Sequence, residues 1–316
     1  MLNEKLFELI IATGEMLDLE GSVIEKDYYV TQVIHALAEV ESDYFRLIFC
    51  GGTCLAKAHK VVCRMSEDVD FKIQVKQRDS GFSKSRTLKE LKKFRAQINS
   101  SLMLPGLVTG IPVVRNEGKY LRIEMNYPSV FPVSAGLRPH ILLEFTLSDV
   151  RLAVENLSVK TLIEQTLENI NLFKSSSTHC VSVNETAIEK WVGLTRRIAA
   201  IERAYHADDE TLIRHVYDLN AINKADRISA DFYVLAKAII TNDARQFKNQ
   251  HPEYAVDPSS EIQLSLSLLR HKPLWKERYQ KFIEEMVYDN APAIEYEKAI
   301  DVLERISTGV IDTLSQ

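Results

Sequence analysis

The segment 47–73 constrains the fold more than any other part of this 316-residue chain. Its residue order predicts an apolar strand, a turn at Gly51 and Gly52, a short helix, and a second strand that carries Asp68 and Asp70. Fifteen residues separate Gly52 from Asp68. The glycine turn and the two aspartates therefore belong to one compact site.

Asp68 and Asp70 lie two residues apart, so on a strand they point to the same face, roughly 6.5 Å apart along the strand. Val69 and Phe71 then face the opposite side, and we expect them in a core. Two carboxylates on one face suit hard cations such as Mg²⁺, which takes oxygen ligands and retains waters and substrate phosphates. This strand therefore predicts a magnesium site.

The glycine turn adds a second half to that site. Gly51 and Gly52 let a phosphate approach the backbone closely, and a helix that begins near Thr53 presents unpaired N–H groups to it. The Thr53 hydroxyl is placed to cap this helix or to contact phosphate. Each feature alone is common in ordinary turns and solvated strands, and neither a Walker-type phosphate loop nor a Gly-x-Gly-x-x-Gly run is present. Together they predict a site for a nucleoside triphosphate with magnesium.

At these residues the chain resembles the polymerase-β-like nucleotidyltransferases, and within them the AbiEii/AbiGii toxin family. The residues that match the family signature are Gly51, Gly52, Thr53, Leu55, Arg64, Ser66, Asp68 and Asp70. Looser similarity continues through a helix at 24–30, a strand at 137–145 and the Arg-x-x-x-Asp run at 214–218. The resemblance spans roughly residues 22–225.

The resemblance implies an α+β fold: a nucleotidyltransferase domain with a mixed sheet and flanking helices, followed by a C-terminal helical bundle. We expect the first domain, with two N-terminal helices, at 1–175, and a helical domain that closes the nucleotide cleft at 176–316. Hydrophobic periodicity supports this division. It predicts helices at 4–18, 22–40 and 85–102, strands within 108–127 and 139–147, and later helices at 185–205, 209–223, 229–242, 261–270, 274–289 and 293–312.

The third metal carboxylate has two candidates. Glu144 lies in the apolar strand 141–145, where an unpaired charge is costly to bury and a metal ion would remove that cost. Glu124 occupies a similar setting in 121–125, and either residue could instead face water at a strand edge. Family position favours Glu144. One of the three acids could also accept the proton of an attacking hydroxyl.

The resemblance implies further roles in binding the nucleotide. Arg64 and Ser66 precede the aspartates, and Ser66 would bind phosphate or orient Asp68, or be a simple turn residue. Lys190 would be a catalytic cation that neutralises charge on the triphosphate, or an ordinary surface lysine. Arg214 and Asp218 would line the nucleotide cleft, or form a surface ion pair. His215 stands where many relatives carry Asp, which leaves its role open.

The activity implied by the resemblance is the transfer of a nucleoside monophosphate from an NTP to an acceptor hydroxyl, with two Mg²⁺ ions and release of pyrophosphate. The protein would be the toxin of a bacterial toxin–antitoxin or phage-defence system, and its acceptor would be the 3′ end of tRNA. Its antitoxin need not contact it. Two alternatives stay open: a small-molecule nucleotidyltransferase of the antibiotic-modifying type, and an inactive nucleotide-binding module.

Composition limits the remaining possibilities. The formal net charge of −5 does not indicate general nucleic-acid binding, so RNA contact requires a local basic patch. The candidate is the helix 84–95, although a solvated helix face is the default interpretation. It carries Lys84, Arg86, Lys89, Lys92, Lys93 and Arg95 with one acid, Glu90. The four cysteines lack metal-site spacing, and neither a signal segment nor an apolar run of membrane-spanning length is present. We expect a cytoplasmic protein without a membrane partner.

Overall fold

The computed structural model describes residues 4–76, 81, 83–132, 136–174, 176–288 and 294–315. The chain divides into two compact units: Met1–Ser182 with Tyr288–Asn290, and Val183–Val287 with Ala291–Gln316. The boundary expected from the sequence lies at 175/176. The division falls after 182 because a short strand at Ser177–Cys180 still pairs with the sheet of the first unit.

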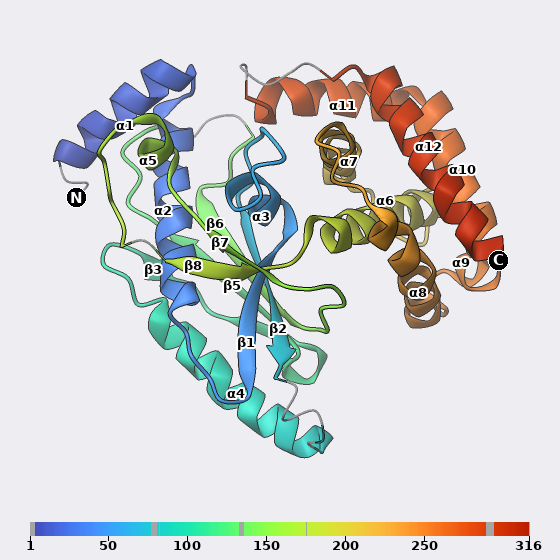
Figure 1. Ribbon diagram of the computed structural model, residues 1–316, viewed down its shortest axis with the longest axis horizontal. Coiled ribbons are helices and arrows are strands. Elements are labelled where there is room, and N and C mark those ends of the chain that lie inside the picture. The colour runs from blue at the N-terminus through green and yellow to red at the C-terminus, as the bar shows by residue number, and fades with distance from the viewer. Residues whose placement is uncertain are drawn as a thin grey trace. The chain divides into compact units, whose positions relative to one another are not determined.

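The first unit is built on a mixed sheet, which has eight strands among the described residues (Figure 1). The strands are β1 (Phe45–Cys50), β2 (Asp68–Val75), β3 (Val108–Thr109), β4 (Val113–Arg115), β5 (Tyr120–Asn126), β6 (His140–Leu147), β7 (Glu155–Ser158) and β8 (Ser177–Cys180). Their order is β3-β5-β6-β2-β1-β8-β7, and β4 also pairs with β5. Strand β2 is antiparallel to β1 and parallel to β6, so the strand predicted to carry the aspartates is central.

The helices of this unit are α1 (Glu4–Leu17), α2 (Gly21–Ala38), α3 (Gly51–Lys57), α4 (Lys84–Ser101) and α5 (Leu162–Thr166), with a 3₁₀ turn at Asn116–Gly118. Two of them begin at side-chain caps. Ser83 accepts a hydrogen bond from the backbone N–H of Arg86 at the start of α4, and Thr161 with Glu164 forms a capping box at α5. A small apolar cluster around Ile10, Ile24 and Ile163 joins α1, α2 and α5.

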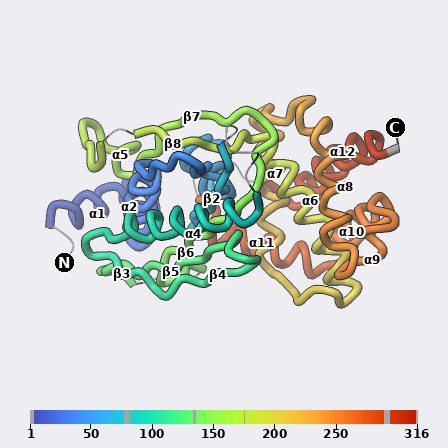
Figure 2. The backbone as a smooth tube through the Cα atoms, turned by 90° about the horizontal axis from the view of Figure 1, so that it is seen from below, coloured from blue at the N-terminus to red at the C-terminus, as the bar shows by residue number. Residues whose placement is uncertain are grey.

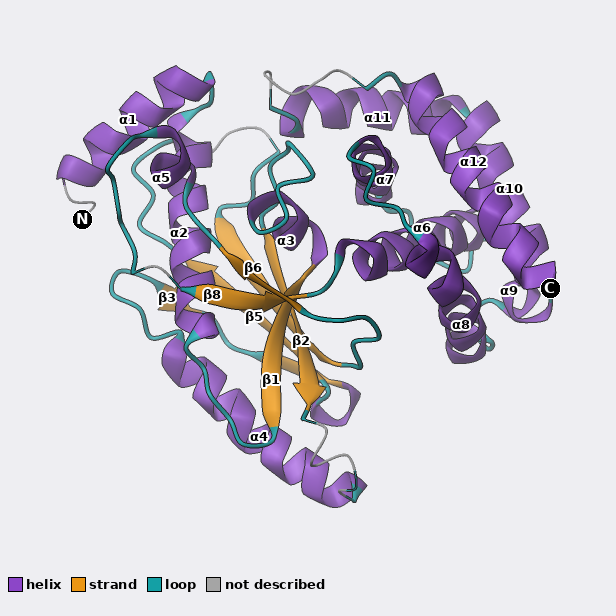
Figure 3. Cartoon of the chain, in the orientation of Figure 1, coloured by secondary structure: helices purple, strands orange, loops and turns teal. Residues whose placement is uncertain are grey.

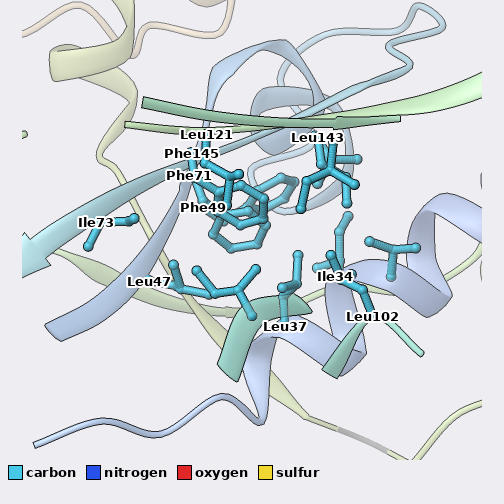
Figure 4. Close-up of a cluster of buried hydrophobic side chains, with 14 of the residues drawn as sticks. Ile34, Leu37, Leu47, Phe49, Phe71, Ile73, Leu102, Leu121, Leu143 and Phe145 are labelled. Carbon is cyan, nitrogen blue, oxygen red and sulfur yellow. The ribbon is translucent and has the colours of Figure 1, made fainter. Parts of the chain in front are cut away.

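The central strands β1, β2, β5 and β6 present one apolar face, because residues two apart on a strand share a face and the residues at these positions are apolar. Val69, Phe71 and Ile73 of β2 are at most 1% exposed, as the alternation predicts. Phe71 stacks between Phe49 and Phe145, with ring centroids 5.2 and 5.8 Å apart (Figure 4). Burial of each such side chain stabilises the fold by about 1.5–3 kcal/mol.

Helices α2 and α4 cover this apolar face (Figures 1 and 2). Each helix carries apolar residues at helical spacing, and those that pack into the sheet core are Val30, Val33, Ile34 and Leu37 of α2 with Leu91, Phe94 and Ile98 of α4. The opposite, polar face of β2 and β6 is therefore the one that remains for a functional site.

The second unit is helical throughout its described elements (Figure 3). Its helices are α6 (Val183–Glu202), α7 (Arg214–Lys224), α8 (Ala230–Phe247), α9 (Pro252–Val256), α10 (Pro258–His271), α11 (Pro273–Met286) and α12 (Tyr296–Ser315), with a 3₁₀ turn at Glu210–Ile213. Proline occupies the first turn of α9, α10 and α11, where its missing N–H costs nothing. The buried Trp191 donates to Ser307 Oγ at 2.9 Å, which ties α6 to α12.

The sequence predicts most helices within a few residues, but it misses β7, α5 and β8 within 155–180 and α9 at Pro252–Val256. These elements have only four or five residues each, too short for periodicity to mark them. The helix starts and ends expected at 293 and 289 lie outside the described residues. Among the described helices, none has the length and apolar character needed to cross a membrane.

Candidate active site

The polar face of the central strands carries the predicted carboxylates. Asp68 and Asp70 of β2 share this face, and the parallel register places Asp70 directly opposite Glu144 of β6. Neighbouring strands lie about 4.8 Å apart, so these acids meet on adjacent strands. Each of the three is partly exposed. The structure thus places all three residues predicted as metal ligands on the same face of two adjacent strands.

The rival candidate, Glu124 of β5, lies farther away. It pairs in register with Leu142 of β6, which places it two strands from β2, at roughly 10 Å. Its carboxylate binds Arg122, with Arg122 Nη2 2.6 Å from Glu124 Oε1. Position therefore favours Glu144 as the partner of Asp68 and Asp70.

Glu144 also has a fixed orientation, because the Tyr120 hydroxyl donates a hydrogen bond to Glu144 Oε1. Burial of the phenol, together with this bond, raises the pKa of Tyr120 to about 12. The phenol therefore keeps its proton at neutral pH and remains a donor to the carboxylate.

The two glycines are required by close packing around the aspartates. Gly51 has φ +77°, which favours glycine, and a side chain there would collide with the Asp70 carboxylate. A Cβ on Gly52 would lie 2.8 Å from Arg64 Nη2 and 2.9 Å from Ser66 Oγ. The helix starts at Gly51, two residues earlier than expected, and its first turn lies against the carboxylate strand.

Thr53 and Arg64 are interior residues of this arrangement. Thr53 is 0% exposed; its hydroxyl lies 2.9 Å from Ser66 Oγ and donates to the carbonyl of Asp68, which fastens α3 to β2. Arg64 is 3% exposed and donates to the carbonyl of Met65 at 2.9 Å. The contacts of both residues therefore support the site from within, and their binding of nucleotide stays a prediction.

Arg138, in the loop before β6, forms an ion pair with Asp68, and sequence reasoning missed it. Its guanidinium contacts Asp68 Oδ1 through Nη1. Its backbone N–H donates to Glu67 Oε2 at 2.8 Å, and its carbonyl accepts from Lys26 Nζ at 2.7 Å. Lys26 and Glu67 form a buried ion pair, 0% and 2% exposed. Burial lowers the pKa of Lys26, and the Glu67 carboxylate opposes that shift.

Three consecutive charged residues of α2 form hydrogen bonds and ion pairs with the segments that surround the site. Glu25 accepts from Ser129 Oγ at 2.6 Å and from the backbone N–H of Val130 at 3.0 Å. Asp27 pairs with Lys57 at the end of α3 and accepts from the backbone N–H of Leu162 at 2.7 Å. A run of three charges within an apolar helix is the signal that could have revealed these contacts, since buried charges require partners.

The donor set suits a divalent cation, because carboxylate oxygens are the ligands that Mg²⁺ prefers. Asp68, Asp70 and Glu144 supply up to three carboxylates on one face, and they are the residues that would hold the ion. Within the described ranges, however, no three His, Cys, Asp or Glu side chains are close enough to coordinate a metal as they stand. Arg138 on Asp68 and Tyr120 on Glu144 account for one oxygen of each acid.

The remaining predicted residues belong to the second unit. Lys190 of α6 and Asp218 of α7 form an ion pair, with Lys190 Nζ 2.9 Å from Asp218 Oδ2, and both side chains are at most 10% exposed. Asp218, which lies one helical turn after Arg214 in the sequence, is thus a partner of Lys190 on the neighbouring helix. Arg214 and His215 occupy the first turn of α7. The structure thus joins Lys190 with Asp218 within the helical unit.

Comparison with known proteins identifies a family and a similar fold. The family described as nucleotidyl transferase AbiEii toxin, type IV TA system, matches residues 36–304. The fold is similar to that of MenT4, a nucleotidyltransferase toxin from Mycobacterium tuberculosis H37Rv, with a TM-score of 0.50, 17% identity, and coverage of 93% of each chain. No curated protein matches the sequence significantly. The chain therefore belongs to the AbiEii family of nucleotidyltransferases, the toxins of type IV toxin–antitoxin systems.

Proposed function

We propose that this toxin transfers a nucleoside monophosphate from an NTP to the 3′-hydroxyl of an RNA, with tRNA as the expected acceptor, in a magnesium-dependent reaction. The acceptor oxygen forms a bond to the α-phosphorus as the bond to the bridging oxygen breaks. The acceptor proton passes to a base or to water, and pyrophosphate leaves. Mg²⁺, when bound, neutralises phosphate charge and orients the reacting oxygens.

The observation that carries this proposal is the register of β2 and β6. It supports a cation site because Asp70 lies opposite Glu144 and Asp68 shares their face. Gly51 packs directly against the Asp70 carboxylate, with no side chain between them. This close contact supports a triphosphate that binds at the glycine turn, beside the cation. Positioning and charge stabilisation are then the sources of rate.

Each predicted residue has a proposed role. Asp68, Asp70 and Glu144 hold two Mg²⁺ ions, and one of these acids takes the acceptor proton. Gly51, Gly52 and Ser66 lie where the phosphates bind, with Thr53 and Arg64 behind them as supports. We assign Lys190 and Arg214 to the charge of the triphosphate and Asp218 to the nucleotide cleft, as the family resemblance implies. The ion pair of Asp218 with Lys190 would also orient that lysine.

Helix α4 offers the basic surface proposed for RNA. It covers the face of the sheet opposite the carboxylates, so its lysines would bind the body of the RNA and not the reacting 3′ end. Three of its six cations already have partners within the first unit: Lys84 pairs with Glu117, Lys93 with Glu90, and Arg95 donates to the carbonyl of Gly118. Lys89 and Lys92 are exposed, with no ion pair among the described residues, and are the proposed contacts for RNA phosphates. Their contribution should weaken as salt concentration rises.

The test incubates the purified protein with Mg²⁺, each labelled NTP in turn, and total tRNA. We expect label from one or a few NTPs on the 3′ end of RNA, loss of transfer in EDTA, and loss in the Asp68→Asn, Asp70→Asn double variant. Glu124→Gln is the matched control, because it removes a carboxylate of the same sheet face that lies two strands from β2.

Two outcomes would contradict the proposal. Labelled RNA after incubation with the double aspartate variant would show that these carboxylates are not needed for transfer. Label on a small molecule in a cell extract, with none on any RNA, would show that the acceptor is a small molecule and not RNA. Lys89→Glu with Lys92→Glu separates the two acceptors further, because it should raise the KM for RNA and leave the KM for NTP unchanged.

A further inference from the structure

We propose that Arg138 is a positioning residue that holds the Asp68 carboxylate while the cation site is empty, and that its guanidinium must leave Asp68 before a divalent cation binds there. The inference rests on the proposed function, because it assumes that Asp68 is a cation ligand. It goes beyond that function by identifying the residue that sets the affinity of the site for the cation.

The backbone of Arg138 is fixed from three sides. Glu67 accepts from its N–H at 2.8 Å, and Lys26 donates to its carbonyl at 2.7 Å. Pro139 follows and restricts the backbone angles of the preceding residue. Because Glu67 and Lys26 are themselves buried and paired, they hold the backbone of Arg138 in place.

The guanidinium at the far end is less constrained. The Arg138 side chain is 36% exposed, and the Asp68 side chain that it contacts is 32% exposed. Its Nε lies 3.8 Å from Glu67 Oε1, a long contact compared with the one to Asp68. A fixed backbone with an exposed head group allows the side chain to rotate toward solvent without disturbing the strand.

The charges around Arg138 direct it to Asp68. Glu67 already pairs with Lys26, and these two buried charges compensate each other. The positive charge of Arg138 is therefore left to balance Asp68. A divalent cation at the same carboxylate would be repelled by the guanidinium, so the two positive groups compete for Asp68.

The experiment measures the affinity of the intact protein for Mn²⁺, without nucleotide, by titration calorimetry or by the electron paramagnetic resonance of free Mn²⁺. We expect Arg138→Ala and Arg138→Gln to bind Mn²⁺ roughly fivefold more tightly than the wild type, the size expected for a partly exposed ion pair. Arg138→Lys, which keeps the charge, should remain within about twofold of the wild type.

Arg46→Ala is the matched control. Arg46 shares the polar face, donates to Gln74 Oε1 at 2.7 Å, and lies four residues of strand, or roughly 13 Å, from the position opposite Asp70. Its removal changes the net charge of the protein equally, so an equal gain in Mn²⁺ affinity would overturn the proposal. Unchanged or weaker Mn²⁺ binding by both Arg138→Ala and Arg138→Gln would also overturn it.

A double-variant cycle identifies the competing group. In an Asp68→Asn background, Arg138→Gln should no longer tighten Mn²⁺ binding, because the shared carboxylate is absent. A gain that persists in this background would mean that Arg138 acts through another group. The Mn²⁺ readout is independent of transfer, so an inactive protein that still shows the Arg138 effect would contradict the proposed function alone.

Discussion

The two faces of strand β2 differ sharply although one backbone carries both. Val69, Phe71 and Ile73 point into a core of buried apolar side chains, while Asp68 and Asp70 point to a face that bears Arg138 and Glu144. The apolar face makes a slip of one residue very costly, because it would bring the aspartates into the core. Packing on one face therefore fixes the register on which the site on the other face depends.

The largest expected effect tests the polar face. Asp70→Asn should lower nucleotide transfer by at least about 10³-fold, because it removes a ligand charge from the cation site. Stability to urea should stay within about 1 kcal/mol of the wild type, since the apolar core is untouched. Transfer assays and urea denaturation on the same preparation would check both halves. A large loss of stability would contradict the view that the polar face serves the site and the apolar face serves stability.

The apolar face should respond in the opposite way. Phe71→Ala removes the central ring of the stack formed with Phe49 and Phe145, and should cost about 3–4 kcal/mol of stability in urea denaturation. Phe7→Ala is the control, because Phe7 is 42% exposed and should cost about 1 kcal/mol or less. Equal losses at both positions would show that the register does not depend on this core.

The choice between Glu144 and Glu124 as the third carboxylate should give a smaller difference in transfer activity. Glu144→Gln should lower transfer by about 10²-fold, while Glu124→Gln should change it by no more than about twofold. The reason is the register, which places Glu144 opposite Asp70 and Glu124 opposite Leu142. The ratio of the two activities at saturating NTP is the measurement. Comparable losses would show that position on the sheet does not decide the ligand.

The smallest expected effect concerns Tyr120. Tyr120→Phe removes the hydrogen bond to Glu144 and should cost about 1 kcal/mol of stability at pH 8. The pKa of Tyr120 is raised to about 12 by burial and by Glu144. This contribution is therefore complete below about pH 10 and is lost as the pH rises from 10 to 12. Denaturation at both ends of this range should show a steeper loss for the wild type; parallel curves would contradict the prediction.

Much of this site follows from local pattern. The alternation of Asp68 and Asp70 with Val69 and Phe71 predicts which residues face the core, and the burial of Val69 and Phe71 confirms it. The family signature, which runs from Gly51 to Asp70, predicts the fold and the enzyme class, and both are confirmed. These predictions succeed because strand period and motif spacing are properties of neighbouring residues.

The partners of buried charges could not be predicted in the same way. Lys26 reaches Glu67 and Arg138 over sequence separations of 41 and 112 residues. The pairing of Lys190 with Asp218 likewise joins two helices. Periodicity does not carry this information, because any of many distant residues could satisfy a buried charge.

The sequence by itself therefore determined the family, the strand that carries the aspartates, and the face on which they lie, because each of these follows from local order along the chain. The tertiary structure alone decided that Glu144 and not Glu124 lies opposite Asp70, and that Arg138, anchored by Lys26 and Glu67, contacts Asp68. Register between strands and pairing across the fold arise from packing of the whole unit, and no single segment specifies them.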